Sequence, residues 1–159
     1  MRITVAAIGR LKAGPERELF DRYLGRAHDA GKRLALTFDE RELAESRAGD
    51  AATRKDQEAA ALSAALPAGT VIAVLDEKGT ALDSRAFAGR IGAWRDAGRE
   101  HLAFVLGGAD GLGSAILGRA ELRLAFGRLT WPHQIARVML AEQLYRAVTI
   151  LSGHPYHRD

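Results

Sequence analysis

The sequence predicts a single α/β domain with a mainly parallel sheet and flanking helices. Its 159 residues suit one domain and are enough to bury a core. Short apolar runs alternate with stretches of helical period, as in parallel strands joined by crossover helices. An uninterrupted apolar run such as residues 71–75 is typical of a strand covered on both faces. We therefore expect residues 1–159 to form one domain without a linker.

Five strands and four helices are expected before the last segment of the chain. The strands are apolar runs at residues 3–8, 34–38, 71–75, 102–106 and, less regularly, 122–126. Helical period is found at residues 16–30, 51–66, 84–97 and 114–119. Asp50, and Asp83 or Ser84, are placed to cap the second and third helices. The charged segment 42–49 is expected to be a loop or an extension of the following helix.

The last thirty residues predict a long amphipathic helix followed by a polar tail. Pro132 suits the first turn of that helix, and a broad apolar face indicates core or interface. Glu142 and Arg146 stand four residues apart in the order that favours an intrahelical ion pair, and if buried beside the tail they would order it. The tail, residues 154–159, carries two imidazoles, a phenol and a guanidinium, which are hydrogen-bonding and stacking groups.

Composition and charge leave most functions open. The net charge of +3 is mildly basic and decides little, although Arg137, Arg146 and Arg158 make phosphate a candidate ligand of the final segment. The chain has no cysteine, which rules out disulfides and thiol nucleophiles and is compatible with a cytoplasmic protein. The first nine residues are too short for a signal peptide, and no apolar stretch is long enough for a membrane span.

Three segments that follow predicted strands are candidates for a ligand site, because ligands of α/β sheets bind beyond the carboxyl ends of the strands. They are residues 76–80, the glycine-rich residues 107–113, and residues 127–132. Four glycines in seven residues suit a nucleoside or a phosphate. Their spacing matches neither the dinucleotide fingerprint nor a Walker loop. Asp76 and Glu77 are interpreted either as acceptors for ribose hydroxyls or as caps of a turn.

Metal and serine chemistry are not favoured by the sequence. His154 and His157 are three residues apart, but Pro155 prevents a regular helix there and no third ligand is evident. The serines have no nucleophile-elbow context. We expect no metal site.

Several motifs together resemble one known family. They are Leu106-Gly107-Gly108-Ala109-Asp110-Gly111-Leu112, Leu129-Thr130-Trp131-Pro132-His133, Arg137-Val138, Glu142-Gln143-Leu144-Tyr145-Arg146-Ala147, and the tail from His154 to Arg158. With them the chain resembles the RlmH family over essentially its whole length. Members of that family are SPOUT-class methyltransferases that methylate N3 of a pseudouridine in large-subunit (23S) ribosomal RNA with S-adenosylmethionine.

The resemblance implies a fold and a set of cofactor residues. It implies a SPOUT-type α/β fold with a trefoil knot near the carboxyl end, a homodimer, and ribosomal RNA, in assembled ribosomes, as the substrate. The implied cofactor residues are Leu75, Gly107, Gly108, Phe126, Gly127, Arg128, Leu129, Thr130 and Trp131. At Gly127, Arg128 and Trp131 this sequence is expected to vary from the family, so their side-chain roles stay open.

The tail supplies candidates for catalysis, since an imino proton must leave N3 as the methyl arrives. We expect His157, with His154 or His133 as alternatives, to accept that proton. Arg158 is expected to steady the base oxygens or a phosphate, and Tyr156 to stack on the target or hydrogen-bond to it. Two other functions remain open: a noncatalytic RNA- or ribosome-binding module that keeps the cofactor pocket, and a dimeric nucleotide-binding regulator.

Overall fold

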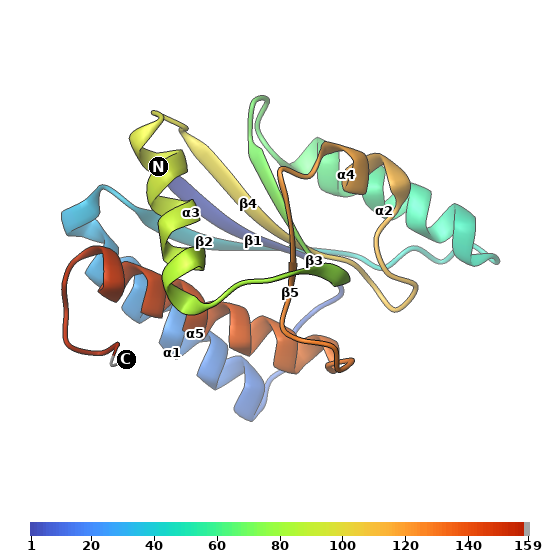
Figure 1. Cartoon of the computed structure of the whole chain (residues 1–159). Coiled ribbons are helices and arrows are strands. Elements are labelled where there is room, and N and C mark those ends of the chain that lie inside the picture. The colour runs from blue at the N-terminus through green and yellow to red at the C-terminus, as the bar shows by residue number, and fades with distance from the viewer. Residues whose placement is uncertain (158–159) are drawn as a thin grey trace.

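A computed structural model describes residues 1–157 of the chain as one layered α/β unit (Figure 1). Its strands are β1 (Arg2–Ile8), β2 (Thr37–Leu43), β3 (Val71–Ala81), β4 (His101–Leu106) and β5 (Leu122–Ala125). Its helices are α1 (Pro15–Gly31), α2 (Ala51–Ala65), α3 (Ser84–Asp96), α4 (Ser114–Arg119) and α5 (His133–Leu151), with a short 3₁₀ helix η1 (Lys32–Leu34). The predicted fold class and its five strands are confirmed.

The five strands form one sheet in the order β2-β1-β4-β3-β5, and every pairing is parallel. Parallel strands need crossover connections, which the helices provide. Helices α1, α3 and α5 cover one face of the sheet, and α2 and α4 cover the other (Figure 1). The carboxyl ends of all strands therefore point to the same edge of the sheet.

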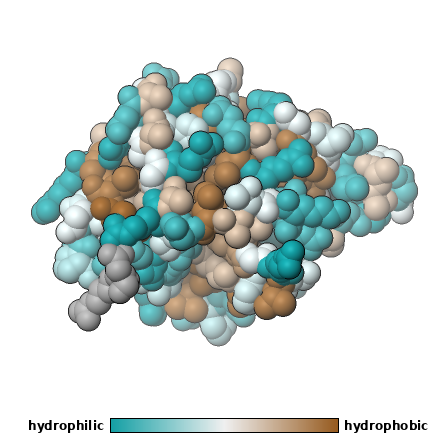
Figure 2. Space-filling view, viewed as in Figure 1, coloured by the Kyte–Doolittle hydropathy of each residue, from teal (hydrophilic) through white to brown (hydrophobic). Residues whose placement is uncertain are grey.

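The core lies on both faces of β1 and β4, because side chains alternate across a strand. Ile3 and Val5 pack in the cluster beneath α1, α3 and α5, whereas Ala6 and Ile8 pack in the cluster beneath α2 and α4. Figure 2 shows the molecule in the same view as Figure 1, with hydrophilic and hydrophobic residues interspersed on the visible face. Both faces of the central strands are thus covered, as their uninterrupted apolar runs predicted.

The second strand was predicted too early in the chain. Residues 32–34 form η1, and Ala35 adopts a left-handed conformation with φ of 54°, so the strand begins at Thr37. It lies at the edge of the sheet and pairs only with β1. An edge strand tolerates charged residues, which explains why its second half is polar and why an apolar run did not mark it. Glu42 accordingly belongs to a strand and not to the predicted loop.

Smaller differences concern the ends of elements. Asp50 and Asp83 cap α2 and α3 as predicted, since their carboxylates accept hydrogen bonds from the amides of Thr53 and Ala86 at 2.8 and 2.7 Å. Strand β3 continues past residue 75 because it pairs again with β5 after a register shift. Helix α5 begins at His133, with Pro132 at its cap. Within residues 1–157, no helix is long and apolar enough to cross a membrane.

Candidate functional site

A cleft of about 650 Å³ opens at the carboxyl edge of the sheet. The three segments that the sequence singled out form its walls, together with the first turn of α5: they are the second half of β3, the glycine-rich loop after β4 and the loop after β5. The lining residues are Leu75, Asp76, Glu77, Lys78, Leu106, Gly107, Gly108, Ala109, Asp110, Gly111, Leu112, Leu117, Arg123, Leu124, Ala125, Phe126, Gly127, Leu129, Thr130, Trp131, His133 and Ala136. Its size is that of a site for one small molecule.

The glycine-rich wall of the cleft is a tight turn that presents backbone. The amide of Gly111 donates to the carbonyl of Gly108 at 3.0 Å, and Gly111 has φ of 84°, a conformation that side chains rarely adopt. Asp110, in the same turn, is held by Arg54 of α2 through two hydrogen bonds of 2.6 and 3.1 Å. The ligand-facing loop therefore owes its shape to its glycines and to one ion pair.

The wall formed by the second half of β3 carries Asp76 and Glu77, the two carboxylates considered in the sequence. Asp76 Oδ1 accepts a hydrogen bond from the amide of Lys78 at 3.0 Å, within the part of β3 where the register with β5 shifts, so Asp76 lies in an irregular strand and the predicted turn is absent. The carboxylate of Glu77 instead reaches across the cleft and accepts a hydrogen bond from the Thr130 hydroxyl at 3.4 Å. Glu77 thereby links two of the three walls.

The loop between β5 and α5 closes on itself and exposes apolar side chains. The indole Nε1 of Trp131 donates to the carbonyl of Phe126 at 3.0 Å. Trp131 is nevertheless 40% exposed and Leu129 is 70% exposed, which is unusual for large apolar residues. Exposed apolar side chains that lie close together are typical of surfaces that contact another molecule.

His133 places a neutral imidazole in the floor of the cleft. Burial lowers its pKa, and the nearby charge of Arg137 acts in the same direction, whereas the backbone of Gly107 and the carboxylate of Glu45 oppose the change. Its Nε2 is buried and has no hydrogen-bond partner among residues 1–157. A neutral ring can accept a proton or a hydrogen bond, so His133 remains chemically available.

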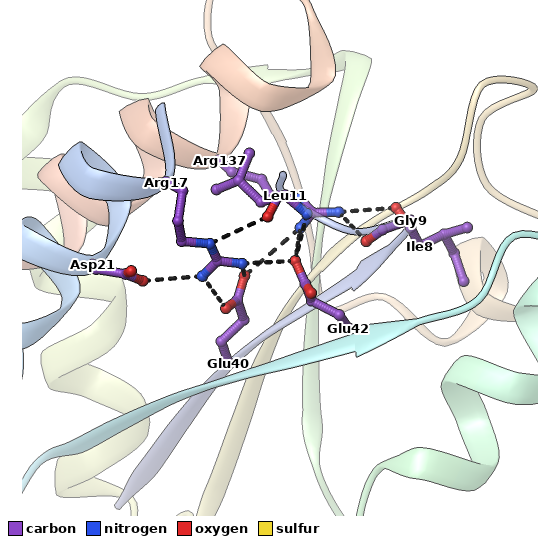
Figure 3. Close-up of polar contacts among 8 residues, drawn as sticks. All are labelled: Ile8, Gly9, Leu11, Arg17, Asp21, Glu40, Glu42 and Arg137. Carbon is purple, nitrogen blue, oxygen red and sulfur yellow. Dashed lines mark hydrogen bonds and ion pairs between the residues drawn. The ribbon is translucent and has the colours of Figure 1, made fainter. Parts of the chain in front are cut away.

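Arg137 of α5 is completely buried, and Figure 3 shows its polar contacts. Its guanidinium donates to the carbonyls of Ile8 and Gly9 at 3.0 and 2.6 Å and to the Glu42 carboxylate at 2.8 Å. Arg17 also binds Glu42, at 2.8 Å. The suggestion that Arg137 contacts phosphate is therefore wrong for this residue, because it ties α5 to the end of β1.

The electrostatics of this buried cluster are dominated by desolvation. Burial raises the pKa of Glu40, although its ion pair with Arg17 at 2.6 Å acts in the opposite direction. Burial also lowers the pKa of Arg137, while Glu42 acts to raise it. Paired charges of both signs at one place keep each other ionised, and removing one would leave the others uncompensated.

The tail folds back and is anchored to the middle of α5. The Tyr156 hydroxyl donates to Glu142 Oε1 at 3.1 Å, and Arg146 binds the same oxygen. Burial, followed by the charge of Glu142, raises the pKa of Tyr156 to about 12. Its ring lies 4.7 Å from that of Tyr145, and Arg146 lies over it at 4.9 Å. The predicted ion pair of Glu142 and Arg146 is thus present, and it orders the tail.

Cleft and tail do not meet within one chain. The loop after β5 precedes α5 and the tail follows it (Figure 1). The tail folds back to Glu142 in the middle of α5, which is about 14 Å of helix from His133, and none of residues 152–157 lines the cleft. His157 Nδ1 lies 3.4 Å from Arg146 Nη1, and His154 Nδ1 accepts the amide of Tyr156 at 3.2 Å. Arg158 lies outside the described residues. The structure therefore places His154, Tyr156 and His157 outside the cleft lining, whereas the alternative base His133 lines the cleft.

Most of the predicted cofactor residues come together. Leu75, Gly107, Gly108, Phe126, Gly127, Leu129, Thr130 and Trp131 all line the cleft, whereas the exposed Arg128 is outside its lining. Sequence reasoning missed Arg123 and Ala136, which line the cleft without belonging to a glycine or polar motif. Within residues 1–157, no group of three or more His, Asp or Glu side chains is placed to hold a metal ion.

A parallel sheet with a glycine-lined cleft at its carboxyl edge is the arrangement typical of single-domain α/β proteins with a small-molecule site. Comparison with known proteins names the family. The sequence model of a protein family described as predicted SPOUT methyltransferases matches residues 1–157 of this chain. The chain therefore belongs to that methyltransferase family.

Close relatives match the chain over its full length. It is 56% identical to the ribosomal RNA large subunit methyltransferase H of Bradyrhizobium diazoefficiens and 57% identical to that of Nitrobacter hamburgensis, with 99% of each chain covered. Among solved structures, a probable methylase family protein from Haemophilus influenzae superposes with a TM-score of 0.47 and 12% identity, over 99% of this chain and 70% of that one.

Proposed function

We propose that this protein transfers a methyl group from S-adenosylmethionine to N3 of a pseudouridine in 23S ribosomal RNA, acting on assembled ribosomes in the cytoplasm. The observation that carries the proposal is the identity of 55–57% with relatives named ribosomal RNA large subunit methyltransferase H. The cleft supports it independently, because its walls are the segments in which the donor is expected.

The cleft fits S-adenosylmethionine in size and in chemistry. Its volume of about 650 Å³ lies within the usual range for small-molecule sites. Leu75 and Phe126 offer apolar surface, Gly107 and Gly108 offer backbone without a Cβ, and the Glu77 carboxylate lies where a cationic ligand would gain from it. These residues, with Gly127, Leu129, Thr130 and Trp131, would hold the donor; Arg128 would contribute through its backbone alone.

The bound donor supplies an already activated methyl group, so the chain itself must orient the acceptor, exclude water and remove one proton. The imidazole of His157 is our candidate for accepting the N3 proton. Tyr156 presents a ring for stacking on the target, and Arg158 presents positive charge for the base oxygens or a phosphate. His154 and His133 remain alternatives for the base.

We propose that the protein acts as a homodimer in which the tail of one subunit serves the cleft of the other. Two observations support this arrangement. Within one chain none of residues 152–157 lines the cleft, and Leu129 and Trp131 expose apolar surface at the cleft mouth. An isologous dimer would cover that surface and supply the missing groups twice. The trefoil knot implied by the resemblance remains part of the same proposal.

The test is methyl transfer from labelled S-adenosylmethionine to ribosomes purified from cells that lack this protein, followed by mass spectrometry of the nucleosides. Label on a pseudouridine N3 is the expected result, and it should be lost with His157→Ala at saturating donor. Donor binding without transfer to any ribosomal particle would refute the proposal and favour the noncatalytic ribosome-binding module. Binding of free nucleotides without any response to ribosomes would favour the nucleotide-binding regulator.

A further inference from the structure

One face of α2 contacts two segments of the chain that are remote in sequence. The first is residues 44–50, which we call the linker segment because it joins β2 to α2. The second is the glycine loop, residues 107–113, which forms one wall of the cleft. Arg54 and Glu58 stand four residues apart, and so lie on the same face of the helix. Each of these two side chains touches both segments.

Arg54 makes the charged link. Its Nε and Nη2 bind the two oxygens of Asp110 at 2.6 and 3.1 Å, and its Nη1 donates to the carbonyl of Ala48 at 3.0 Å. A bidentate contact fixes the direction as well as the distance of the carboxylate. The ion pair raises the pKa of Arg54 and lowers that of Asp110. Both groups are thus ionised when they hold the loop.

Glu58 makes the second link, one helical turn further on. It is buried, and its Oε1 accepts the amide of Ser46 at 2.9 Å. The other oxygen lies against the glycine loop, because a Cβ built on Gly108 would lie 3.0 Å from it. The backbone of the loop therefore approaches α2 more closely than a side chain would allow.

The loop needs such support, because its four glycines give it many conformations when nothing holds it. A ligand that binds a mobile loop must offset the entropy lost when the loop is ordered, which weakens binding. Contacts that fix the loop beforehand reduce that loss. The same contacts tie the linker segment to the loop, although none of residues 44–50 lines the cleft in the described structure.

We propose that Arg54 and Glu58 are positioning residues that hold the glycine loop ready for the methyl donor and couple it to the linker segment. The inference rests on the proposed function, since it assumes that the donor occupies this cleft. It has two consequences. Loss of the Arg54–Asp110 pair should weaken donor binding, and donor binding should slow amide hydrogen exchange in the linker segment, which the donor does not touch.

The experiment compares binding of S-adenosylmethionine by calorimetry with amide exchange measured by mass spectrometry. In Arg54→Gln, we expect the Kd for the donor to rise about tenfold and the protection of residues 44–50 on binding to disappear. Asp110→Asn should behave alike, and the double variant should bind no more weakly than either single variant, because both remove one interaction. In Arg54→Gln, whose side chain does not line the cleft, methylation at saturating donor should change by less than about twofold, since a preorganised loop acts on binding.

Arg99→Gln is the matched control. Arg99 forms an exposed ion pair with Glu121 at 3.2 Å just before β4, at the opposite edge of the sheet from the cleft. Its loss should leave the donor Kd and the exchange of the linker segment unchanged. The inference would be overturned if the wild type binds the donor and Arg54→Gln binds it equally well, with equal protection of residues 44–50 from amide exchange. Failure of the wild type to bind the donor would instead refute the proposed function, and the inference with it.

Discussion

Replacement of Arg137 by Met should destabilise the protein strongly. Met has a similar length but cannot donate to the carbonyls of Ile8 and Gly9 or to the Glu42 carboxylate, which now lie 2.6 to 3.0 Å from the guanidinium. The site is completely buried, so water cannot replace the lost donors. Removing one partner of a buried charge pair typically costs about 3–5 kcal/mol. For a chain of this size that corresponds to a fall in Tm of roughly 6–20 °C.

The assay is unfolding by urea and by heat, followed by circular dichroism. Arg128→Gln is the control, since Arg128 is exposed and its loss should change stability by less than about 0.5 kcal/mol. The double variant Arg137→Met with Glu42→Gln should recover part of the loss, because it leaves one fewer uncompensated carboxylate. A loss below about 1 kcal/mol in Arg137→Met would refute this account of the buried cluster.

Three further outcomes are expected. Gly79→Ala should destabilise the protein by about 2 kcal/mol or more, since its Cβ would lie 2.6 Å from the backbone of Arg123. Gly89→Ala, with open space around its Cβ, should instead stabilise helix α3 by about 0.5–1 kcal/mol. Equal effects of the two substitutions on urea unfolding would contradict this. The imidazole of His133, followed by NMR, should titrate below the ordinary pKa of histidine. Because the pKa of His133 is lowered in the folded protein, its contribution to stability is present above the ordinary pKa of histidine and is lost as pH falls through the lowered pKa. A titration midpoint at or above the ordinary pKa would show that burial does not set the pKa of this imidazole. Ultraviolet titration should find one tyrosine that ionises at a pH of about 12, and this ionisation should be absent in Tyr156→Phe. Because the pKa of Tyr156 is raised in the folded protein, its contribution to stability is present below the ordinary pKa of tyrosine and is lost as pH rises through the raised pKa. An unchanged titration curve in the variant would exclude Tyr156 as the source.

Local rules predicted much of the fold because they act over a few residues. Asp50 and Asp83 were identified as caps since a carboxylate just before a helix satisfies its first amides. The run at residues 71–75 was identified as a buried strand from its composition. The same rule failed at residues 34–38, where apolar residues fill a turn, because the strand that follows lies at an edge and needs no apolar run.

Long-range partners were beyond sequence reasoning. Nothing near Arg137 in the chain reveals that Glu42 and the end of β1 will neutralise and surround it. Nor does the glycine pattern reveal that Arg54 will hold Asp110. The tail illustrates a third limit: its residue types suggested chemistry, whereas its distance from the cleft depends on the length and direction of α5. The cleft itself was predictable, because strand ends of a parallel sheet share one edge.

The strand order also constrains how this chain can fold while it is being synthesised. Strand β1 lies between β2 and β4, and Arg2 pairs with a residue as distant as His101. The first strand to leave the ribosome therefore keeps one edge unpaired until about two thirds of the chain has emerged. Helix α1 waits longer still, because its main helical partner is α5. Distant pairings of this kind make folding slow, so the nascent chain must be protected from aggregation until its last helix arrives.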